Sequence, residues 1–282
     1  MAQDLPGYLD LIKRTRPDDL LVVTRELDPA HEITALVVKL EREARKRPIV
    51  ICERVRGSRF PVLTNLHASR SRLALAMGSA PEEMLTTYLR AMDQPLSPRT
   101  VTGGPCKDVV LTGDAIDLYD LPQILHHEGD AGAYLTSAIS FAKDPTSETW
   151  NCAYNRLMIQ GRDRTSIHLT LGKHLWEFQR IAESLGRPLP VAFAIGVHPA
   201  IALGALAIGS IDEDERAIMG ALLREPLELV KCETSDVLVP AHAELIIEAE
   251  ILPGARTPEG PFGEFTGYSL GEREREVVQV RA

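Results

Sequence analysis

Two glutamates near the end of the chain are the residues whose spacing first suggests chemistry. Glu259 and Glu264 lie in the segment TPEGPFGEFTGY, residues 257–268, on either side of a Gly-Pro-Phe-Gly linker. Proline and glycine prevent this linker from forming a regular helix or a central strand. Three glycines within eight residues let the backbone bend closely around a bulky ligand. Composition alone leaves two interpretations open, a functional loop or a surface turn with solvated glutamates.

A second segment contains an amide and a basic side chain close together. TWNCAYNRLMIQGRDR places Asn151 five positions before Arg156, with apolar and aromatic residues around both. Side chains an odd number of positions apart point to opposite faces of a regular strand, so a site that contains both residues requires a turn or bulge between them. The alternative is that Arg156 is a partly buried arginine paired with a carboxylate and has no further function.

Two more candidate residues lie on predicted helices. In GKHLWEFQR, His174 lies just inside a helix start, where free amides and the positive end of the helix can face an anion. In DEDERAIMGALL, Glu215 lies on a helix whose apolar side includes Ile218, Met219 and Leu222. Taken alone, both are more often structural, because a histidine near apolar residues usually packs and a glutamate in an acidic stretch is usually solvated.

Other polar and sulfur-containing residues give weaker signals. A glycine-rich loop carries His126, His127, Glu128 and Asp130, and it could form a pocket rim, although a plain surface loop is the commoner interpretation. The remaining histidines match no motif: His31, His67, His168, His198 and His242. The four cysteines, at 52, 106, 152 and 232, form no CxxC pair, which favours reduced thiols in the core over a disulfide framework or a zinc site.

The elements that must position these residues can be inferred from periodicity. An amphipathic helix is expected over 32–46, a buried strand over PIVICERV and a helix from Pro81 through MLTTYLRAMD. The Pro- and Gly-rich stretch LSPRTVTGGP then indicates a domain boundary near residue 105. Beyond it, short apolar runs alternate with turns, and helices are expected only over 172–186 and 213–223. The fold class is therefore an α/β domain followed by an α+β or barrel-like domain.

Composition and charge restrict the class of protein. The chain has 282 residues, of which 44% are hydrophobic and 25% charged, as in globular proteins of one large or two ordinary domains. A net charge of −9 argues against nucleic acid as a partner. The apolar stretch 189–209 is interrupted by Pro190, His198 and Pro199, so we expect a strand and a short helix and no membrane span. No secretory signal is recognisable at the N-terminus, so the expected location is the cytoplasm.

Taken together, these segments resemble one family. The set comprises Asn151-x4-Arg156, His174, Glu215-x4-Gly220-Ala221-Leu222, ELVKCETSDVLVPAHAELIIEAEI and PEGPFGEFTGY. Its order and spacing are similar to those of the UbiD-type decarboxylases, which use prenylated FMN, over about residues 105–270. The resemblance implies a reversible, non-oxidative decarboxylase of an aromatic or α,β-unsaturated carboxylic acid that acts through a covalent adduct with prenylated FMN.

The resemblance also implies which residues bind the cofactor and its ions. Asn151, His174 and Glu215 would ligate one divalent ion, usually Mn²⁺, that bridges to the flavin phosphate beside a monovalent cation, expected to be K⁺. Arg156 and Lys173 complete the expected cofactor-binding set. Lys173 stands where some relatives that act on cinnamate-like acids have glutamine, so we expect it to favour a second carboxylate or a phenolate.

The catalytic residues implied by the resemblance are Arg156, Glu259 and Glu264. Arg156 would grip the substrate carboxylate as a planar fork, and Glu259 would hold that fork in place. Glu264 would donate the proton that replaces carbon dioxide, and it must therefore be protonated at that step, which partial burial favours.

The expected organisation follows the family. Residues 1–105 would form a small N-terminal α/β domain, and residues 106–282 a split β-barrel flavin-binding domain with inserted helices. The family's C-terminal closing domain is absent, and the final EREREVVQVRA begins a strand and stops, which suggests a truncated or processed chain. Expected partners are a flavin prenyltransferase that supplies the cofactor, and either further copies in a dimer or hexamer or a separate closing subunit. The alternative function is a non-catalytic flavin-binding subunit or one half of a split decarboxylase.

Overall fold

The N-terminal part of the chain is a small layer of helices on a three-stranded sheet. The structure is a computed structural model that describes residues 3–264 and 266–282. The elements of this layer are α1 Leu5–Thr15, β1 Leu20–Leu27, α2 Glu32–Arg42, β2 Ile49–Val55 and β3 Val62–Thr64. β1 and β2 are parallel and β3 is antiparallel to β2. α2 ends four residues before the predicted helix end, because the turn that follows places Arg45 at a φ of 52°.

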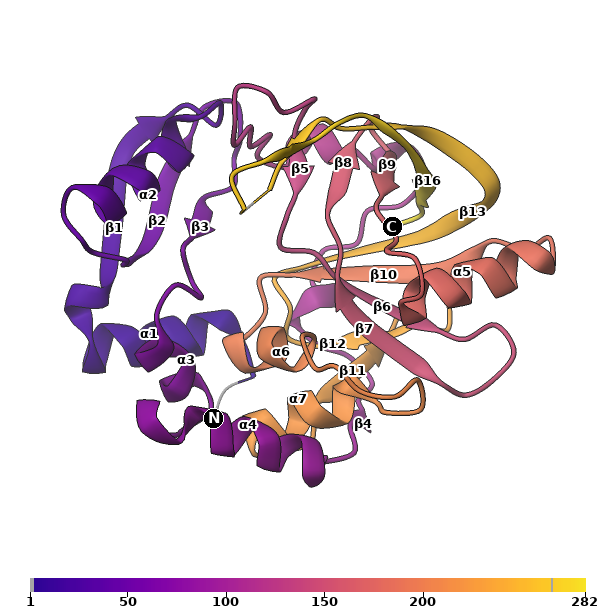
Figure 1. Ribbon diagram of the computed structural model, residues 1–282, viewed down its shortest axis with the longest axis horizontal. Coiled ribbons are helices and arrows are strands. Elements are labelled where there is room, and N and C mark those ends of the chain that lie inside the picture. The colour runs from indigo at the N-terminus through magenta and orange to yellow at the C-terminus, as the bar shows by residue number, and fades with distance from the viewer. Residues whose placement is uncertain (1–2, 265) are drawn as a thin grey trace.

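Two helices connect this layer to the rest of the molecule, α3 Arg70–Ala76 and α4 Met84–Asp93. The predicted helix from Pro81 is present as a 3₁₀ turn over Pro81–Glu83 followed directly by α4. α4 packs against α7 Glu215–Leu223, and α3 packs against α6 Pro199–Gly204 (Figure 1). The helix that carries Glu215 is therefore packed between α4 and α6. The remaining 3₁₀ turns are Pro17–Asp19, Pro105–Lys107, Gly113–Ala115 and Leu118–Asp120.

A curled eight-stranded sheet forms the second part and confirms the predicted barrel-like class (Figure 1). Its strand order is β5-β8-β9-β16-β13-β10-β6-β7. The strands are β5 Tyr134–Leu135, β6 Ile139–Lys143, β7 Trp150–Tyr154, β8 Leu157–Ile159, β9 Arg164–Ile167, β10 Leu189–Ile195, β13 Leu245–Glu259 and β16 Arg273–Val280. β13 is 15 residues long and pairs with β10 and β16, with an irregularity in register between Ile251 and Arg256. The run EREREVVQV contains β16, Arg273–Val280, which is an internal strand that pairs with β13 on one side and, over Glu276–Gln279, with β9 on the other.

The smaller elements complete the second part. α5 His174–Ser184 packs against β10 and β13, and the expected strand and short helix of 189–209 are β10 and α6. A three-stranded sheet has the order β12-β11-β4, with β4 Arg99–Thr100, β11 Glu228–Lys231 and β12 Leu238–Pro240. β14 Phe262–Gly263 and β15 Ser269–Leu270 form a separate two-stranded pair. No helix in the described ranges is long and apolar enough to span a membrane.

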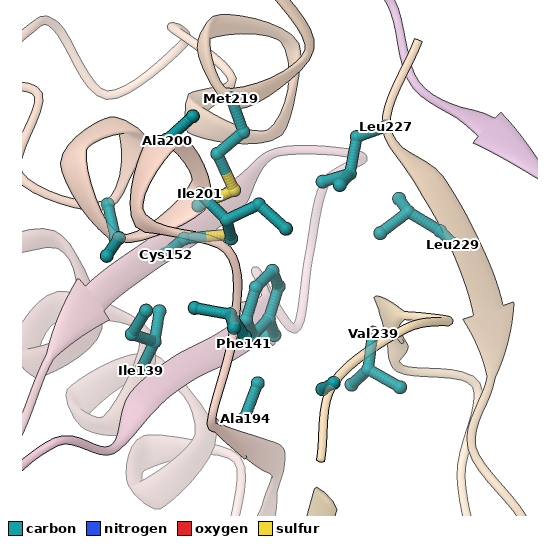
Figure 2. Packing of buried hydrophobic residues seen from close by; sticks show 14 of the residues in the cluster. Ile139, Phe141, Cys152, Ala194, Ala200, Ile201, Met219, Leu227, Leu229 and Val239 are labelled. Atoms are coloured by element: carbon teal, nitrogen blue, oxygen red, sulfur yellow. The ribbon is translucent and has the colours of Figure 1, made fainter. Parts of the chain in front are cut away.

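The largest hydrophobic core lies between the sheet and helices α6 and α7. It includes Phe141, Cys152, Ile201 and Met219, all 1% exposed or less (Figure 2). Cys52 and Cys232 are also buried, as expected for thiols that serve as small apolar side chains. This core packs α7 against β7. It therefore holds Glu215, on α7, close to Asn151, on β7.

One matched pair of substitutions tests this core. Ile201→Val should lower the free energy of unfolding by about 0.5–1.5 kcal/mol, because a buried methyl group is lost from a packed site. Ile208→Val removes the same group from a side chain that is 81% exposed and should change stability by less than about 0.5 kcal/mol. Urea unfolding measures the change in the free energy of unfolding for both variants. Equal changes would contradict the burial of Ile201 in this core.

Candidate active site

Arg156 lies in a break between two strands. β7 ends at Tyr154 and β8 begins at Leu157, so Asn155 and Arg156 belong to neither strand. This interruption meets the requirement for a turn between Asn151 and Arg156, and it directs Arg156 away from the face that regular alternation would give it.

The structure brings the predicted arginine and both glutamates together. Arg156 Nε donates to Glu259 Oε1 at 2.9 Å and Nη2 donates to Glu259 Oε2 at 3.2 Å, which is a bidentate pair. Arg156 Nη1 donates to Glu264 Oε1. The side chain of Glu259 is 2% exposed and that of Arg156 12%, whereas Glu264 is 29% exposed. The buried glutamate therefore anchors the arginine, and the more accessible one faces solvent and the neighbouring cavity.

The guanidinium retains donors for a ligand. Arginine carries five N–H groups, of which the two glutamates engage three, so one N–H on each terminal nitrogen remains. Two N–H groups in one plane match the two oxygens of a carboxylate. The arginine also lies over the Phe262 ring, 4.7 Å from its centroid, and Phe262 packs against Tyr134 with ring centroids 4.5 Å apart.

A cavity of about 260 Å³ opens beside this cluster. It is lined by Thr136, Tyr154, Asn155, Arg156, His168, Thr170, Phe262 and Glu264. Burial, and next the positive charges of Arg275 and Arg156, hold the pKa of His168 below its usual 6.5. The cavity lining thus combines an imidazole, several hydroxyl groups and one amide with the ion pair of Arg156 and Glu264.

Further charged and polar groups surround Glu259. The Arg275 Nε atom lies 3.6 Å from Glu259 Oε2, so the carboxylate has a second cation on its outer side. Burial, and next the charge of Glu259, raise the pKa of the Tyr134 hydroxyl. Arg156 and Arg275 together balance the charges of Glu259 and Glu264, so an added anion would meet no net negative charge here.

Asn151 and Glu215 form a second buried polar pair. Asn151 Nδ2 donates to Glu215 Oε1 at 3.0 Å, and the Cys152 backbone N–H donates to Glu215 Oε2 at 3.1 Å. Asn151 is 5% and Glu215 6% exposed. Burial raises the pKa of Glu215 to about 7, because the carboxylate has lost water without gaining a cation. Asn151 Oδ1 is buried and accepts no hydrogen bond from any described residue.

These two residues fit a divalent cation. An unengaged buried amide oxygen beside a desolvated carboxylate supplies the oxygen ligands that Mn²⁺ prefers. The third expected ligand, His174, is the first residue of α5, which packs against β7. Within residues 3–264 and 266–282, no hydrogen bond joins His174 to Asn151 or Glu215, and no group of three or more His, Cys, Asp or Glu side chains is spaced for a metal. A metal here would therefore depend on the Asn151 amide.

Lys173 lies apart from the cavity beside Arg156. It is the N-cap residue of α5, its side chain is exposed, and it is not among the residues that line the cavity. Its expected contact with the cofactor or with a second acidic group of the substrate therefore remains a prediction.

Sequence reasoning missed several residues of this site, among them Tyr134, His168 and Arg275. His168 had a usable signal, since alternation in TSIHLTLG places it on the face opposite the buried Ile167 and Leu169. Tyr134 and Arg275 had none, because their proximity to Glu259 arises only when distant strands pair.

The curled sheet holds an arginine between two carboxylates, and a separate buried amide–carboxylate pair is suited to a cation. This fold and this site together define the class of the protein. Two family models match the chain. Residues 13–92 match the 3-octaprenyl-4-hydroxybenzoate carboxy-lyase N-terminal domain, and residues 99–282 match the Rift-related domain of the same carboxy-lyase. The chain therefore belongs to the UbiD family, as its motifs predicted.

Curated relatives match along nearly the whole chain. Anhydromevalonate phosphate decarboxylase of Methanothermobacter thermautotrophicus is 34% identical over 263 residues, which cover 93% of this chain and 60% of that protein. An uncharacterized protein of Synechocystis, sll0936, is 31% identical over 305 residues and covers 100% of this chain. The chain spans about 60% of the length of these relatives.

Solved structures share the fold. The UbiD-class enzyme HmfF from Pelotomaculum thermopropionicum, in an evolved dimeric form in complex with prFMN, matches with a TM-score of 0.94 and 43% identity over 99% of this chain and 64% of that one. Vanillic acid decarboxylase of Sedimentibacter hydroxybenzoicus in its closed form matches with a TM-score of 0.94 and 29% identity over 100% of this chain and 61% of that one. The N-terminal α/β layer and the curled sheet are thus the arrangement of UbiD-class enzymes.

Proposed function

We propose that this protein is a cytoplasmic, reversible, non-oxidative decarboxylase of an aromatic or α,β-unsaturated carboxylic acid. The observation that carries the proposal is the Arg156 guanidinium, which is clamped by Glu259 and Glu264 at a cavity and still has two N–H groups for a carboxylate. Family membership supports the reaction class, and relatives named as decarboxylases support it further. The proposed division into domains is 1–105 and 106–282.

Each residue of the cluster has a distinct proposed role. Arg156 binds the substrate carboxylate through its remaining donors, and Glu259 keeps the guanidinium plane fixed. Glu264 lies beside this bound carboxylate on the same guanidinium, takes a proton from solvent, and delivers it to the carbon that has lost carbon dioxide. Phe262 and the polar cavity wall hold the rest of the acid.

The proposed cofactor is prenylated FMN with Mn²⁺ and K⁺. When bound, prenylated FMN would supply the electron sink that allows carbon dioxide to leave. Covalent catalysis by this cofactor, which the family resemblance implies, is part of the same proposal. Asn151, Glu215 and His174 would hold the metal that neutralises the flavin phosphate, and Arg156 and Lys173 would complete the cofactor site.

A second candidate function is a flavin-binding subunit, or half of a split decarboxylase that needs a separate closing domain. The similar vanillic acid decarboxylase of Sedimentibacter hydroxybenzoicus, VdcCD, includes a separate component, VdcD, and this favours the second candidate. If the chain acts without such a subunit, we propose that it forms a homodimer or a hexamer.

One experiment separates these functions. The protein is produced together with a flavin prenyltransferase, native mass spectrometry reports flavin and Mn²⁺, and a panel of aromatic and unsaturated acids is assayed for carbon dioxide release and for deuterium exchange into the product. Bound flavin with turnover of at least one acid is expected. Bound flavin without turnover on any acid would favour the subunit, and a protein that binds no flavin would contradict both proposals.

A further inference from the structure

We propose that Asp130 is a positioning residue that sets Glu264 against Arg156, and this proposal rests on the decarboxylase function above. Asp130 Oδ1 accepts from the Gly263 backbone N–H at 2.8 Å, and Oδ2 accepts from the His127 backbone N–H at 3.0 Å. One carboxylate thus joins two segments that are 133 positions apart in the sequence. Hydrogen bonds from backbone amides to a carboxylate are stronger than those between neutral groups.

The two joined segments are in direct contact. The Ala131 backbone N–H donates to the Pro261 carbonyl oxygen at 2.8 Å. A Cβ atom at Gly263 would lie only 2.4 Å from His127 Cδ2, so the backbone at Gly263 approaches the imidazole more closely than any other residue type would allow. Asp130 therefore fixes a tightly packed junction.

This junction lies between two residues of the site. Phe262 precedes Gly263 and carries the ring over which Arg156 lies, and Glu264 follows it and accepts from Arg156 Nη1. A shift of the Gly263 amide must therefore move Glu264. Arg156 itself keeps its bidentate contact with Glu259 on β13, which Asp130 does not touch. Loss of Asp130 should thus displace the proton donor and leave the carboxylate-binding arginine in place.

The loop that carries Asp130 is anchored at its other end to the N-terminal layer. The Thr34 hydroxyl and His126 Nδ1 are 3.0 Å apart, the His31 N–H donates to the Leu125 carbonyl at 2.9 Å and the Leu125 N–H donates to the Pro29 carbonyl at 3.2 Å. Because this end is hydrogen-bonded near the start of α2, Asp130 links the site segment to the N-terminal layer. Glu264 is consequently positioned by the N-terminal layer as well as by its own backbone hydrogen bond to the Tyr268 carbonyl.

The first test reads the contact without any catalysis. Hydrogen–deuterium exchange of peptides covering residues 257–268 is compared in the full-length protein and in Asp130→Ala, Asp130→Asn and Asp144→Ala. Asp144 is the matched control, because its Oδ1 accepts from the Thr146 backbone N–H at 2.6 Å in a loop away from the cavity. Asp130→Ala should speed exchange in this segment by roughly 10-fold or more. Unchanged exchange would overturn the proposal.

The second test reads positioning in the reaction. In the cofactor-loaded protein, Asp130→Ala should lower kcat by roughly 10²-fold, as expected for a small displacement of a reacting group, with KM changed by less than about twofold. The isosteric Asp130→Asn keeps one acceptor oxygen, so its kcat should lie between those of Asp130→Ala and the unaltered protein. Asp144→Ala should have the kcat and KM of the unaltered protein. A rise in KM at constant kcat would overturn the proposal. If the unaltered protein shows no turnover, the proposed function fails. The exchange experiment alone then decides whether Asp130 holds the backbone at Gly263.

Discussion

Glu264→Gln is expected to lower decarboxylation by roughly 10²- to 10⁴-fold while flavin binding persists. Glutamine keeps the size of the side chain and can still accept a hydrogen bond from Arg156, but it cannot deliver a proton to the carbon that carbon dioxide leaves. Glu264 is the more exposed of the two glutamates that bind Arg156, so its replacement leaves the buried clamp between Arg156 and Glu259 intact. The same loss should appear in deuterium exchange of the product, because exchange requires the same proton transfer.

Glu272→Gln is the matched control for this variant, since Glu272 is exposed, follows β15 and has no role in the proposed site. Its rates should equal those of the unaltered protein. Normal turnover in Glu264→Gln, or loss of flavin from it, would assign the proton transfer elsewhere.

Asn151→Ala is expected to give the second large effect, a loss of Mn²⁺ affinity greater than the roughly 10- to 100-fold that follows removal of an outer partner of a metal ligand. The reason is that Asn151 Oδ1 is a buried acceptor with no hydrogen-bond donor among the described residues, as a ligand atom should be before the ion arrives. Without the ion, the flavin phosphate would face the buried Glu215 carboxylate, so flavin content should fall as well.

Calorimetric titration with Mn²⁺ and elemental analysis of the purified protein measure this effect. Asn151→Asp is the informative companion, because it retains an oxygen ligand and should keep Mn²⁺ binding while losing the hydrogen bond from Nδ2 to Glu215. If Asn151→Ala binds Mn²⁺ as tightly as the unaltered protein, the ion does not use this residue.

Much of the fold could be predicted because it depends on local patterns. The apolar spacing of residues 33–40 gave α2, and the interruption at Pro199 gave a short helix after β10. α1 was missed, although Leu5, Tyr8 and Ile12 form its buried stripe and Asp4 accepts a capping hydrogen bond from the Gly7 N–H. The polar and acidic character of the first ten residues concealed that stripe, since Pro6 and Gly7 stand between its first two buried residues and are poor helix formers.

The candidate site was only partly accessible to sequence reasoning. Arg156, Glu259 and Glu264 were found from a family resemblance, because contacts between residues 103 and 108 positions apart leave no local pattern. His168 could have been found from strand alternation alone. Arg275 reaches Glu259 only because β16 pairs with the far end of β13, and this register is a property of the folded sheet. Asp130 was assigned to a loop of uncertain role, and its partner at Gly263 could not be inferred from either segment.

The length of β13 restricts where this protein can gain or lose residues during evolution. The strand runs from the hydrophobic core, where it pairs with β10, through the irregularity after Ile251 to Glu259 at its far end. Deleting or inserting a single residue within residues 256–259, which pair in regular register with β16, would turn the following side chains to the opposite face, and the carboxylate that clamps Arg156 would point away from it. Length variation among homologues should therefore be excluded from residues 256–259, even though Arg256 and Pro258 are exposed.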